Sequence, residues 1–387
     1  MPHSPSDAER DQHPAPESES AAARTPAVDE RLDLLRRWLR GIFGADDLEI
    51  APASADASFR RYFRVRRGPQ NDRETWIAMD APPGKEDIRP YVRVAAMLTS
   101  AGVNAPRVIA QDVEQGFVLN TDLGSRTYLS ELQQGADPHR LYQDAIDALV
   151  RMQVGAAEDA RTLPPYDEAL LRREMALFTE WFCGRHLRLA LSSAELAALA
   201  SVFDLLNAAA LGQPTVFVHR DYHSRNLMVC DGGAEGPNPG VLDFQDAVCG
   251  PITYDLASLL RDCYIAWPPA QVLEWVALFR ARAMGCGLDC GRDEREFLRW
   301  LNLMGAQRHL KAIGIFARLA HRDGKLGYLK DIPRTLEYLS AAGAAYSELG
   351  FLRAFIEQRV KPALESAATR SPDGSDAPMR GATRCAQ

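Results

Sequence analysis

The sequence lacks an excess of basic charge. Its 387 residues include 45 lysines and arginines against 52 aspartates and glutamates, which gives a formal net charge of -7. Proteins that hold nucleic acid or an anionic membrane surface need a basic footprint, so we expect neither partner. An anionic ligand would need a local basic pocket.

Long hydrophobic runs are also missing. The most apolar stretch, residues 196–211, is interrupted by Asp204 and Asn207, and no segment has the roughly 18 consecutive apolar residues typical of a membrane-spanning helix. The first 20 residues have no basic region followed by an apolar core, so they do not resemble a secretory signal. We therefore expect a cytoplasmic protein with no membrane partner.

Paired cysteine motifs are absent. The seven cysteines are scattered through the chain and show no CxxC spacing. Cys286 and Cys290 lie four residues apart, but without a second pair they do not predict a structural metal site. We expect reduced thiols.

Lysine is scarce, because 40 of the 45 basic residues are arginine. The five lysines are Lys85, Lys311, Lys325, Lys330 and Lys361. Since arginine takes the place of lysine throughout this chain, a lysine that is missing from a familiar motif carries little weight.

The chain does contain enough apolar material for two lobes, with 46% hydrophobic and 25% charged residues. Residues 1–28 and 367–387 lack large apolar side chains and are predicted to be disordered. Between them, a helix capped by Asp29 and a series of short strands predict a small α+β lobe over residues 29–121. Long amphipathic helices predict a mainly helical lobe over residues 122–366.

Hydrophobic periodicity predicts the elements of both lobes. In the first lobe we expect strands at residues 59–66, 75–79 and 116–120, with a helix at residues 88–100. In the second lobe we expect helices at residues 137–153, 166–183, 193–211, 254–264, 270–284, 294–320 and 334–363.

A strongly polar segment interrupts the helical lobe directly after a buried strand. Residues 216–226 read VFVHRDYHSRN, and a predicted β-hairpin follows, built from NLMVC and VLDFQD around a loop rich in Gly, Pro and Asn. Antiparallel pairing would bring Asn226 and Asp243 together at the open end of the hairpin, beside the loop that contains Asp221. Convergent oxygen donors are what Mg²⁺ requires, and Asp221 would be available to accept a proton from a hydroxyl group.

The motif HRDYHSRN resembles the catalytic loop HRDLxxxN of protein kinases, and LDF stands where the metal-binding DFG begins. The continuation FQDAVCGPITYDLA departs from the protein kinases and resembles the aminoglycoside phosphotransferases and choline kinases. Four further stretches resemble the bacterial anomeric kinases of N-acetylmuramate and N-acetylglucosamine, and this similarity covers most of residues 50–340. The stretches are DASFRRYFRV, MDAPPGKED, GFVLNTDLG and AQRHLKAIGIFARLAHRDGKLGYLKDIPR.

The resemblance implies a two-lobed α+β protein-kinase-like fold with ATP and Mg²⁺ as cofactors. Residues 29–121 would bind the nucleotide, and residues 122–366 would carry catalysis and the acceptor. Asp221 would be the catalytic base, while Asn226 and Asp243 would hold Mg²⁺ bridging the ATP phosphates. Asp255 would brace the catalytic loop, and His219 would pack beneath it.

The lysine that usually binds the nucleotide phosphates is missing from its strand. In related kinases it lies in VAIK, whereas TWIAMD here puts Met79 and Asp80 in that neighbourhood. Lys85, Arg60 or Arg61 would have to replace it, and arginine can bind phosphate oxygens in a bidentate manner.

The glycine-rich loop GxGxxG is missing as well. A loop with small residues near Ser58 would have to cover the nucleotide instead. The adenine contact is expected at Leu119, Asn120 and Thr121, in the segment that resembles the connector between the lobes. Arg64 alternates along its strand and is expected to be solvated.

An anomeric hydroxyl as acceptor would yield a sugar 1-phosphate. N-acetylmuramate also carries a lactyl carboxylate, which favours a cationic residue in the helical lobe. Arg308 is the main candidate and Arg185 a weaker one, and Asp246 could assist the metal or the acceptor or lie on the surface. The role of His223 stays open.

Two alternatives remain at the level of sequence. The acceptor could be another small hydroxylated molecule, such as an aminoglycoside or an amino alcohol. The chain could also bind ATP as a regulator without transferring phosphate. In each case the partner is a small molecule, and no protein partner is implied.

Overall fold

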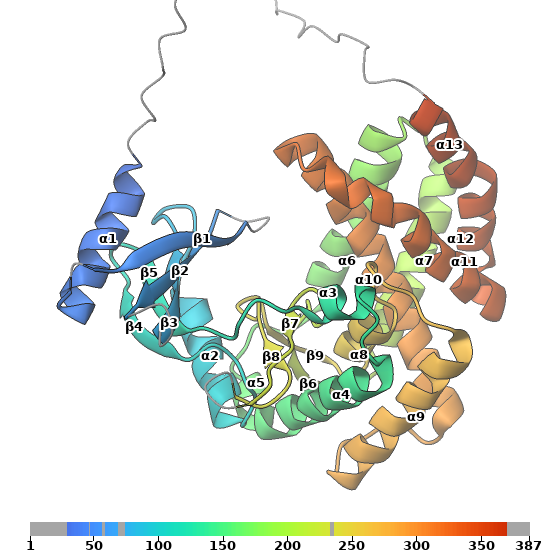
Figure 1. The fold of residues 1–387 in the computed structure, drawn as a ribbon. Coiled ribbons are helices and arrows are strands. Elements are labelled where there is room, and N and C mark those ends of the chain that lie inside the picture. The colour runs from blue at the N-terminus through green and yellow to red at the C-terminus, as the bar shows by residue number, and fades with distance from the viewer. Residues whose placement is uncertain (1–28, 46, 56–58, 69–73, 233–235, 370–387) are drawn as a thin grey trace, which may run out of the picture. The chain divides into compact units, whose positions relative to one another are not determined.

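The computed structural model describes residues 29–45, 47–55, 59–68, 74–232 and 236–369 (Figure 1). The described part of the chain divides into two units, with the boundary after Gly44. In the first unit, helix α1 (Glu30–Phe43) begins after Asp29, whose side chain accepts a hydrogen bond from the backbone N–H of Leu32 at 3.1 Å. It ends at Gly44, whose φ of 60° is the left-handed conformation that glycine adopts at low cost.

The amino-terminal lobe of the second unit is an antiparallel five-stranded sheet in the order β1-β2-β3-β5-β4. Strands β1 and β4 are missing from the elements predicted by the sequence, because neither has a continuous apolar pattern. The elements of this lobe are β1 (Glu49–Ala55), β2 (Arg61–Arg67), β3 (Glu74–Asp80), α2 (Arg89–Ser100), β4 (Val108–Asp112) and β5 (Phe117–Thr121).

Register gives the two faces of this sheet different roles. Arg64, Ile77 and Asn120 are neighbours across β2, β3 and β5, so their side chains share one face. Farther along that face, Met79 and Val118 enter the hydrophobic core with α2. The buried side chains of the opposite face include Leu119.

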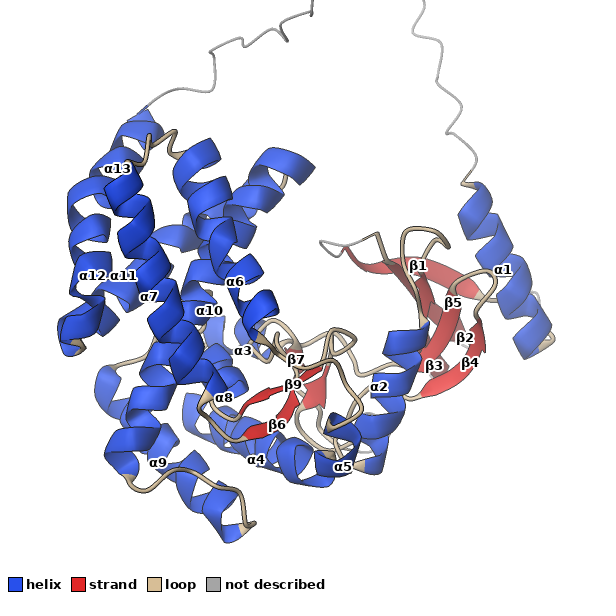
Figure 2. Ribbon diagram, turned by 180° about the vertical axis from the view of Figure 1, so that it is seen from behind, coloured by secondary structure: helices blue, strands red, loops and turns tan. Residues whose placement is uncertain are grey.

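The carboxy-terminal lobe is mainly helical and surrounds the long helix α10, as Figure 2 shows. Its first half contains α3 (Tyr128–Gln133), α4 (Pro138–Gly155), α5 (Ala157–Ala160), α6 (Glu168–Leu177), the π-helix η1 (Phe178–His186), α7 (Ser193–Leu211), β6 (Thr215–Val218), β7 (Leu227–Met228), β8 (Gly240–Val241) and β9 (Val248–Pro251). Its second half contains α8 (Tyr254–Leu260), α9 (Pro269–Gly285), α10 (Glu294–Asp323), η3 (Leu326–Asp331), α11 (Ile332–Ala345), η4 (Ser347–Leu349), α12 (Gly350–Phe355), η5 (Ile356–Val360) and α13 (Lys361–Thr369).

The segments predicted to be helical are helical in the structure, but two of the predicted long helices are interrupted. The predicted helix at residues 334–363 is divided into α11, η4, α12, η5 and α13, and the one at residues 166–183 passes from α6 into the π-helix η1. The apolar period persists through such breaks, so it does not reveal them. By length and composition, α7 is the one described helix that could cross a membrane, which is weak evidence. Its buried Leu199, Phe203 and Leu206 belong to a core cluster of this lobe.

The predicted hairpin exists, but its register differs from the expectation by one residue. Leu227 pairs with Val241, and the Leu242 N–H donates to the Asn226 carbonyl at 2.9 Å, so Asn226 lies opposite Leu242 rather than Asp243. The prediction centred the loop between residues 234 and 235, which lie outside the described residues. The preceding strand β6 pairs with β9 instead of joining this hairpin.

Candidate active site

Asp255, at the start of α8, holds the loop that follows β6 in place through hydrogen bonds to its backbone. The Asp255 carboxylate accepts hydrogen bonds from the backbone N–H groups of His219 at 2.7 Å and Arg220 at 3.0 Å. Burial raises the pKa of Asp255 to about 7, despite these two bonds. His219 is buried under the same loop, and its Nδ1 accepts from the Asp221 N–H at 3.2 Å. This arrangement is consistent with the structural roles predicted for both residues.

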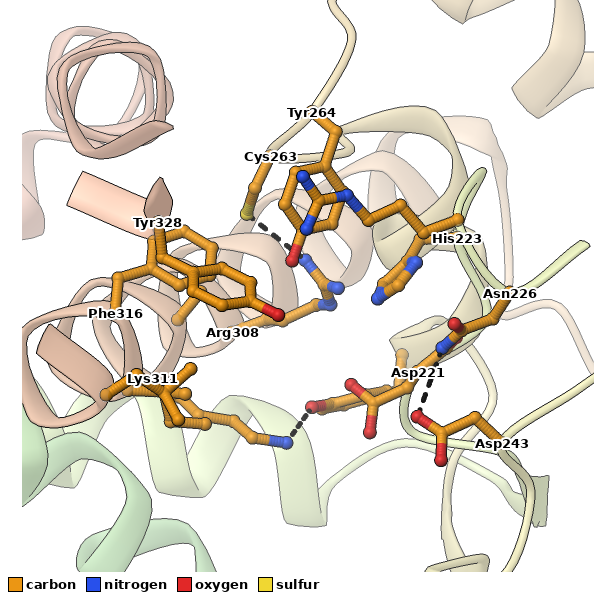
Figure 3. A pocket seen from close by; sticks show the side chains of 15 residues that line it. Asp221, His223, Asn226, Asp243, Cys263, Tyr264, Arg308, Lys311, Phe316 and Tyr328 are labelled. Atoms are coloured by element: carbon orange, nitrogen blue, oxygen red, sulfur yellow. Dashed lines mark hydrogen bonds between the residues drawn. The ribbon is translucent and has the colours of Figure 1, made fainter. Parts of the chain in front are cut away.

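Asp221, Asn226 and Asp243 lie together at the open end of the hairpin (Figure 3). The Asn226 Nδ2 donates to the Asp221 carbonyl at 3.0 Å and to Asp243 Oδ2 at 3.3 Å. Asp243 has a φ of 64°, an uncommon conformation for a residue with a side chain. The polar cluster therefore forms although the predicted register is wrong.

The Asp221 carboxylate is ionised despite its burial. Burial alone would raise its pKa, but the positive charges of Lys311, His223, Arg220 and Arg308 outweigh that effect and lower the pKa to about 2. An ionised carboxylate inside a cavity can accept a proton from a bound hydroxyl group.

A cavity, here called the α10 cavity, separates Asp221 from helix α10. In Figure 3 the side chains of Arg308 and Lys311 point into it from α10, and Tyr264, Phe316 and Tyr328 supply aromatic surface. The complete lining is Asp221, His223, Arg225, Asn226, Asp243, Tyr254, Cys263, Tyr264, Arg308, Lys311, Ala312, Ile315, Phe316, Leu319 and Tyr328.

Arg308 is the predicted acceptor residue that the structure brings into this cavity. It is 5% exposed, and its Nε has no hydrogen-bond partner among the described residues. Its Nη1 lies 3.8 Å from the Cys263 Sγ. Burial disfavours the charge, but Cys263, Tyr254 and Asp221 overcome this effect and raise the pKa above its ordinary value. A buried cation with an unused donor can bind an anionic group.

Lys311 is a cavity residue that the sequence analysis missed. Its Nζ donates to the Tyr254 hydroxyl at 2.9 Å and lies 3.2 Å from Glu174 Oε1. Glu174 also accepts from Arg220 and Tyr166, so a buried network holds the base of the catalytic loop. Arg308 and Lys311 are three residues apart and therefore share one helix face, and this spacing could have predicted that both side chains enter the same cavity.

A second cavity, here called the interlobe cavity, lies between the sheet and the catalytic loop. It shares Arg225, Asn226, Asp243 and Tyr328 with the α10 cavity, so the two spaces adjoin at the polar cluster. Its lining is Ala53, Tyr62, Arg64, Ile77, Tyr91, Pro106, Asn120, Thr121, Asp122, Leu123, Gly124, Ser125, Thr127, Arg225, Asn226, Met228, Leu242, Asp243, Phe244 and Tyr328.

Arg64 is a second residue that the sequence analysis misjudged. It was expected to be solvated, but it lines the interlobe cavity and forms a bidentate ion pair with Asp122, with N···O distances of 2.6 and 3.1 Å. It also donates to the Gly124 carbonyl at 2.7 Å. These bonds connect β2 with the segment that follows β5.

The four residues that were expected to bind the nucleotide phosphates or to lie in the loop covering the nucleotide differ in position. Arg60 Nη2 lies 3.7 Å from Asp243 Oδ1, at the polar cluster. Arg61 forms a bidentate ion pair with the buried Asp80, and Lys85 is exposed. Ser58 lies outside the described residues.

The three candidates for the adenine contact are also separated. Asn120 and Thr121 line the interlobe cavity. Leu119 does not line it, because strand alternation directs its side chain to the opposite face of the sheet. The residues that we expect to contact adenine are therefore reduced to Asn120, Thr121 and the segment after them.

Two of the candidate acceptor residues lie elsewhere. Asp246 is exposed and accepts a hydrogen bond from Gln245 Nε2 at 3.3 Å. Arg185 is also exposed, and its guanidinium carbon lies 4.1 Å from the centre of the Trp181 ring. Neither residue lines the two cavities. The sequence pattern showed their charge but not the direction of their side chains.

His223 lines the α10 cavity and packs edge-on against Tyr264. Burial lowers the pKa of the His223 imidazole below its ordinary value. Its Nδ1 has no hydrogen-bond partner among the described residues.

Asp243 and Asn226 provide the donor set that suits Mg²⁺. A carboxylate and an amide oxygen are enough, because Mg²⁺ completes its coordination with phosphate and water. No group of three or more His, Cys, Asp or Glu side chains in the described part of the chain could hold a metal.

The model of the phosphotransferase enzyme family (APH) matches residues 49–302. The chain belongs to this family. An N-acetylmuramate/N-acetylglucosamine kinase of Pseudomonas aeruginosa is 49% identical over 79% of this chain and 86% of the relative. Kinases of the same name from Pseudomonas putida and Neisseria meningitidis are 46% and 42% identical, over 86% and 84% of this chain and 94% and 95% of the relatives. The protein is thus a kinase-type phosphotransferase, as its sequence predicted.

Solved structures support the protein-kinase-like fold. A choline kinase from Cryptosporidium parvum has a TM-score of 0.58 at 11% identity, covering 83% of this chain and 98% of that chain. A Plasmodium vivax ethanolamine kinase has a TM-score of 0.56 at 13% identity, covering 82% and 89%. At these identities the likeness establishes the fold alone, which confirms the predicted small β-rich lobe and helical lobe.

Proposed function

We propose that this protein transfers phosphate from ATP to the anomeric hydroxyl of N-acetylmuramate and N-acetylglucosamine, in the recycling of cell-wall sugars. The observation that carries the proposal is that Asp221 lines the α10 cavity together with the cation Arg308, beside Asn226 and Asp243, which line both cavities. The names of the relatives support the choice of sugars. We further propose a cytoplasmic location, where ATP is supplied.

In the proposed reaction, Asp221 accepts the proton of the anomeric hydroxyl as that oxygen attacks the terminal phosphate. Its lowered pKa keeps the carboxylate ready for this role. Asn226 and Asp243 would hold Mg²⁺, which would neutralise charge on the ATP phosphates. The network of Glu174, Lys311 and Arg220 keeps the loop in position, and positioning supplies much of the catalysis in phosphate transfer.

The proposed nucleotide site is the interlobe cavity. Arg60 is the candidate that replaces the missing lysine, since its guanidinium lies 3.7 Å from Asp243, where the phosphates would be bound. Arg61 is a poorer candidate because its charge is neutralised by Asp80. The Lys85 Nζ lies 4.7 Å from the centre of the Phe59 ring, and Lys85 lines neither cavity.

The proposed acceptor site is the α10 cavity, with Arg308 binding the lactyl carboxylate and the aromatic side chains packing against the sugar ring. The buried Arg308 on α10 disfavours the aminoglycoside alternative, because a polycationic acceptor would meet a like charge there. A regulator without activity would be expected to have lost Asp221, Asn226 or Asp243, and all three are present.

Arg308→Gln is expected to raise KM for N-acetylmuramate by about 10- to 100-fold, because a charge-assisted hydrogen bond to the carboxylate is lost. The KM for N-acetylglucosamine, which has no carboxylate, is expected to change much less. Steady-state kinetics with both sugars measures the difference. Arg185→Gln is the matched control, since it removes an arginine that lies outside the cavity; equal effects of Arg308→Gln on both sugars would contradict the assignment.

ADP release from the wild-type protein, with ATP and a panel of acceptors, tests the proposed function. We expect turnover with N-acetylmuramate and N-acetylglucosamine and little with kanamycin or choline. No turnover with either sugar would contradict the proposal, and turnover only with kanamycin or choline would support the alternative acceptor.

A further inference from the structure

Arg225 is a cation of the catalytic loop to which the proposed reaction assigns no role. It directly precedes Asn226 and lines both the α10 cavity and the interlobe cavity. The residue is half-buried rather than fully enclosed, so a ligand can reach its side chain. Among the described residues it forms no hydrogen bond and no ion pair through its guanidinium group.

Two tyrosine rings hold this guanidinium group on the acceptor side. Its carbon lies 3.7 Å from the centre of the Tyr264 ring and 5.4 Å from the centre of the Tyr328 ring. Contacts with aromatic rings can keep a guanidinium in place while its N–H donors stay available for a ligand. Tyr264 lines the α10 cavity but not the interlobe cavity. The Arg225 guanidinium is therefore placed to meet the acceptor rather than the nucleotide.

Arg308 approaches the same part of the cavity from α10. Figure 3 shows Arg308, Tyr264 and Tyr328 on the side of the cavity that is remote from Asp243. His223 lies near both arginines, because burial lowers the pKa of its imidazole and the charges of Arg308 and Arg225 act in the same direction. The two guanidinium groups therefore face one space, one from the helix and one from the catalytic loop.

No carboxylate of the described part of the chain forms an ion pair with either of these arginines. Burial raises the pKa of Asp331, and the charge of Arg225 only partly offsets this effect. The ion pair of Asp331 is instead with Arg334, at 4.0 Å. Two cations that share a poorly solvated cavity repel each other, so an anion bound between them is stabilised by both. A carboxylate suits this space because guanidinium groups bind its two oxygens in a bidentate manner.

We propose that Arg225 and Arg308 together bind the lactyl carboxylate of N-acetylmuramate. Arg225 would be a specificity-determining residue, because N-acetylglucosamine has the same sugar ring without the lactyl group. The inference rests on the proposed function, and it adds to Arg308 a second residue that recognises the acceptor. It also makes the catalytic loop itself part of the acceptor site.

The test compares two ligands that differ in one charge. The methyl ester of N-acetylmuramate keeps the lactyl group but has no carboxylate. Titration calorimetry with Mg²⁺ and a non-hydrolysable ATP analogue measures the binding of each ligand without turnover. The wild-type protein is expected to bind N-acetylmuramate about 100-fold more tightly than the ester, since two charge-assisted contacts of about 10-fold each are lost. Equal affinities would overturn the proposal without any substitution.

Arg225→Gln removes one of the two cations. The preference for N-acetylmuramate over its ester should fall to about 10-fold, because Arg308 still binds the carboxylate. Arg225→Lys keeps the charge but not the planar donor group, so it should restore part of the preference. A purely structural role for Arg225 would weaken the acid and the ester equally. That result, or an unchanged preference in Arg225→Gln, would overturn the proposal.

Arg299→Gln is the matched control. The Arg299 guanidinium carbon also lies over a tyrosine, 5.3 Å from the centre of the Tyr346 ring, but Arg299 lines neither cavity. Its substitution should leave the preference for the acid unchanged. Because binding is measured without turnover, a wild-type protein that phosphorylates neither sugar would contradict the proposed function, while the comparison of acid and ester would still decide the role of Arg225.

Discussion

Asp221→Asn is expected to lower kcat by about 10²- to 10⁴-fold, because the amide keeps the shape of the carboxylate but cannot accept the proton of the acceptor hydroxyl. ATP binding should be nearly unchanged, since Asp221 lies on the acceptor side of the polar cluster. Single-turnover kinetics and calorimetry with ATP measure the two effects separately. Activity within a few-fold of the wild type would show that Asp221 is not the base.

The pH dependence gives the same test a second readout. The pKa of Asp221 is lowered to about 2, so the base is deprotonated throughout the mildly acidic and neutral range. Its function would be lost only as the pH falls through that low value. An acid limb of kcat/KM near pH 6 that disappears in Asp221→Asn would contradict the charge environment provided by Lys311 and Arg308.

Asp243→Asn is expected to have the second large effect, a loss in kcat/KM of about 10³-fold, because several kcal/mol of charge neutralisation depend on metal binding. Calorimetry should show that Mg²⁺ strengthens ATP binding to the wild type and has much less effect on the variant. Asp246→Asn is the matched control, since it changes an exposed carboxylate three residues away. Equal Mg²⁺ dependence in the wild type and Asp243→Asn would contradict the metal assignment.

The main features of the polar cluster could be predicted from the sequence because they depend on local order. A buried strand followed by HRDYHSRN and a hairpin brings Asn226 near Asp243 even if the register is misjudged by one residue. The hairpin loop is rich in Gly, Pro and Asn, and this composition does not show which of its residues form the turn. The register of the two hairpin strands could therefore not be predicted. The positive φ of Asp243 depends on tertiary structure, and no local sequence pattern predicted it.

Long-range contacts explain most of the remaining errors. Arg64 alternates along β2 as a solvated residue would, and its partner Asp122 is distant in the sequence. Lys311 is buried because Glu174, on another helix, neutralises its charge. A single sequence shows the charge of each residue but not the partner that the fold brings to it.

Strand assignments were most reliable where apolar residues were continuous. β5 was predicted within one residue at each end, while β1 and β4 were missed. The position of β5 between β3 and β4 depends on those missed strands, so the sequence could not show that its backbone was already paired.

The position of the phosphate in the product tests the central claim most directly. Phosphorus NMR of the product from ATP and N-acetylmuramate should show a phosphate coupled to the anomeric proton, and the product should no longer react as a reducing sugar. The same result is expected with N-acetylglucosamine. A phosphorylated product that remains reducing, with its phosphate on another hydroxyl group, would contradict the claim that this protein is an anomeric kinase.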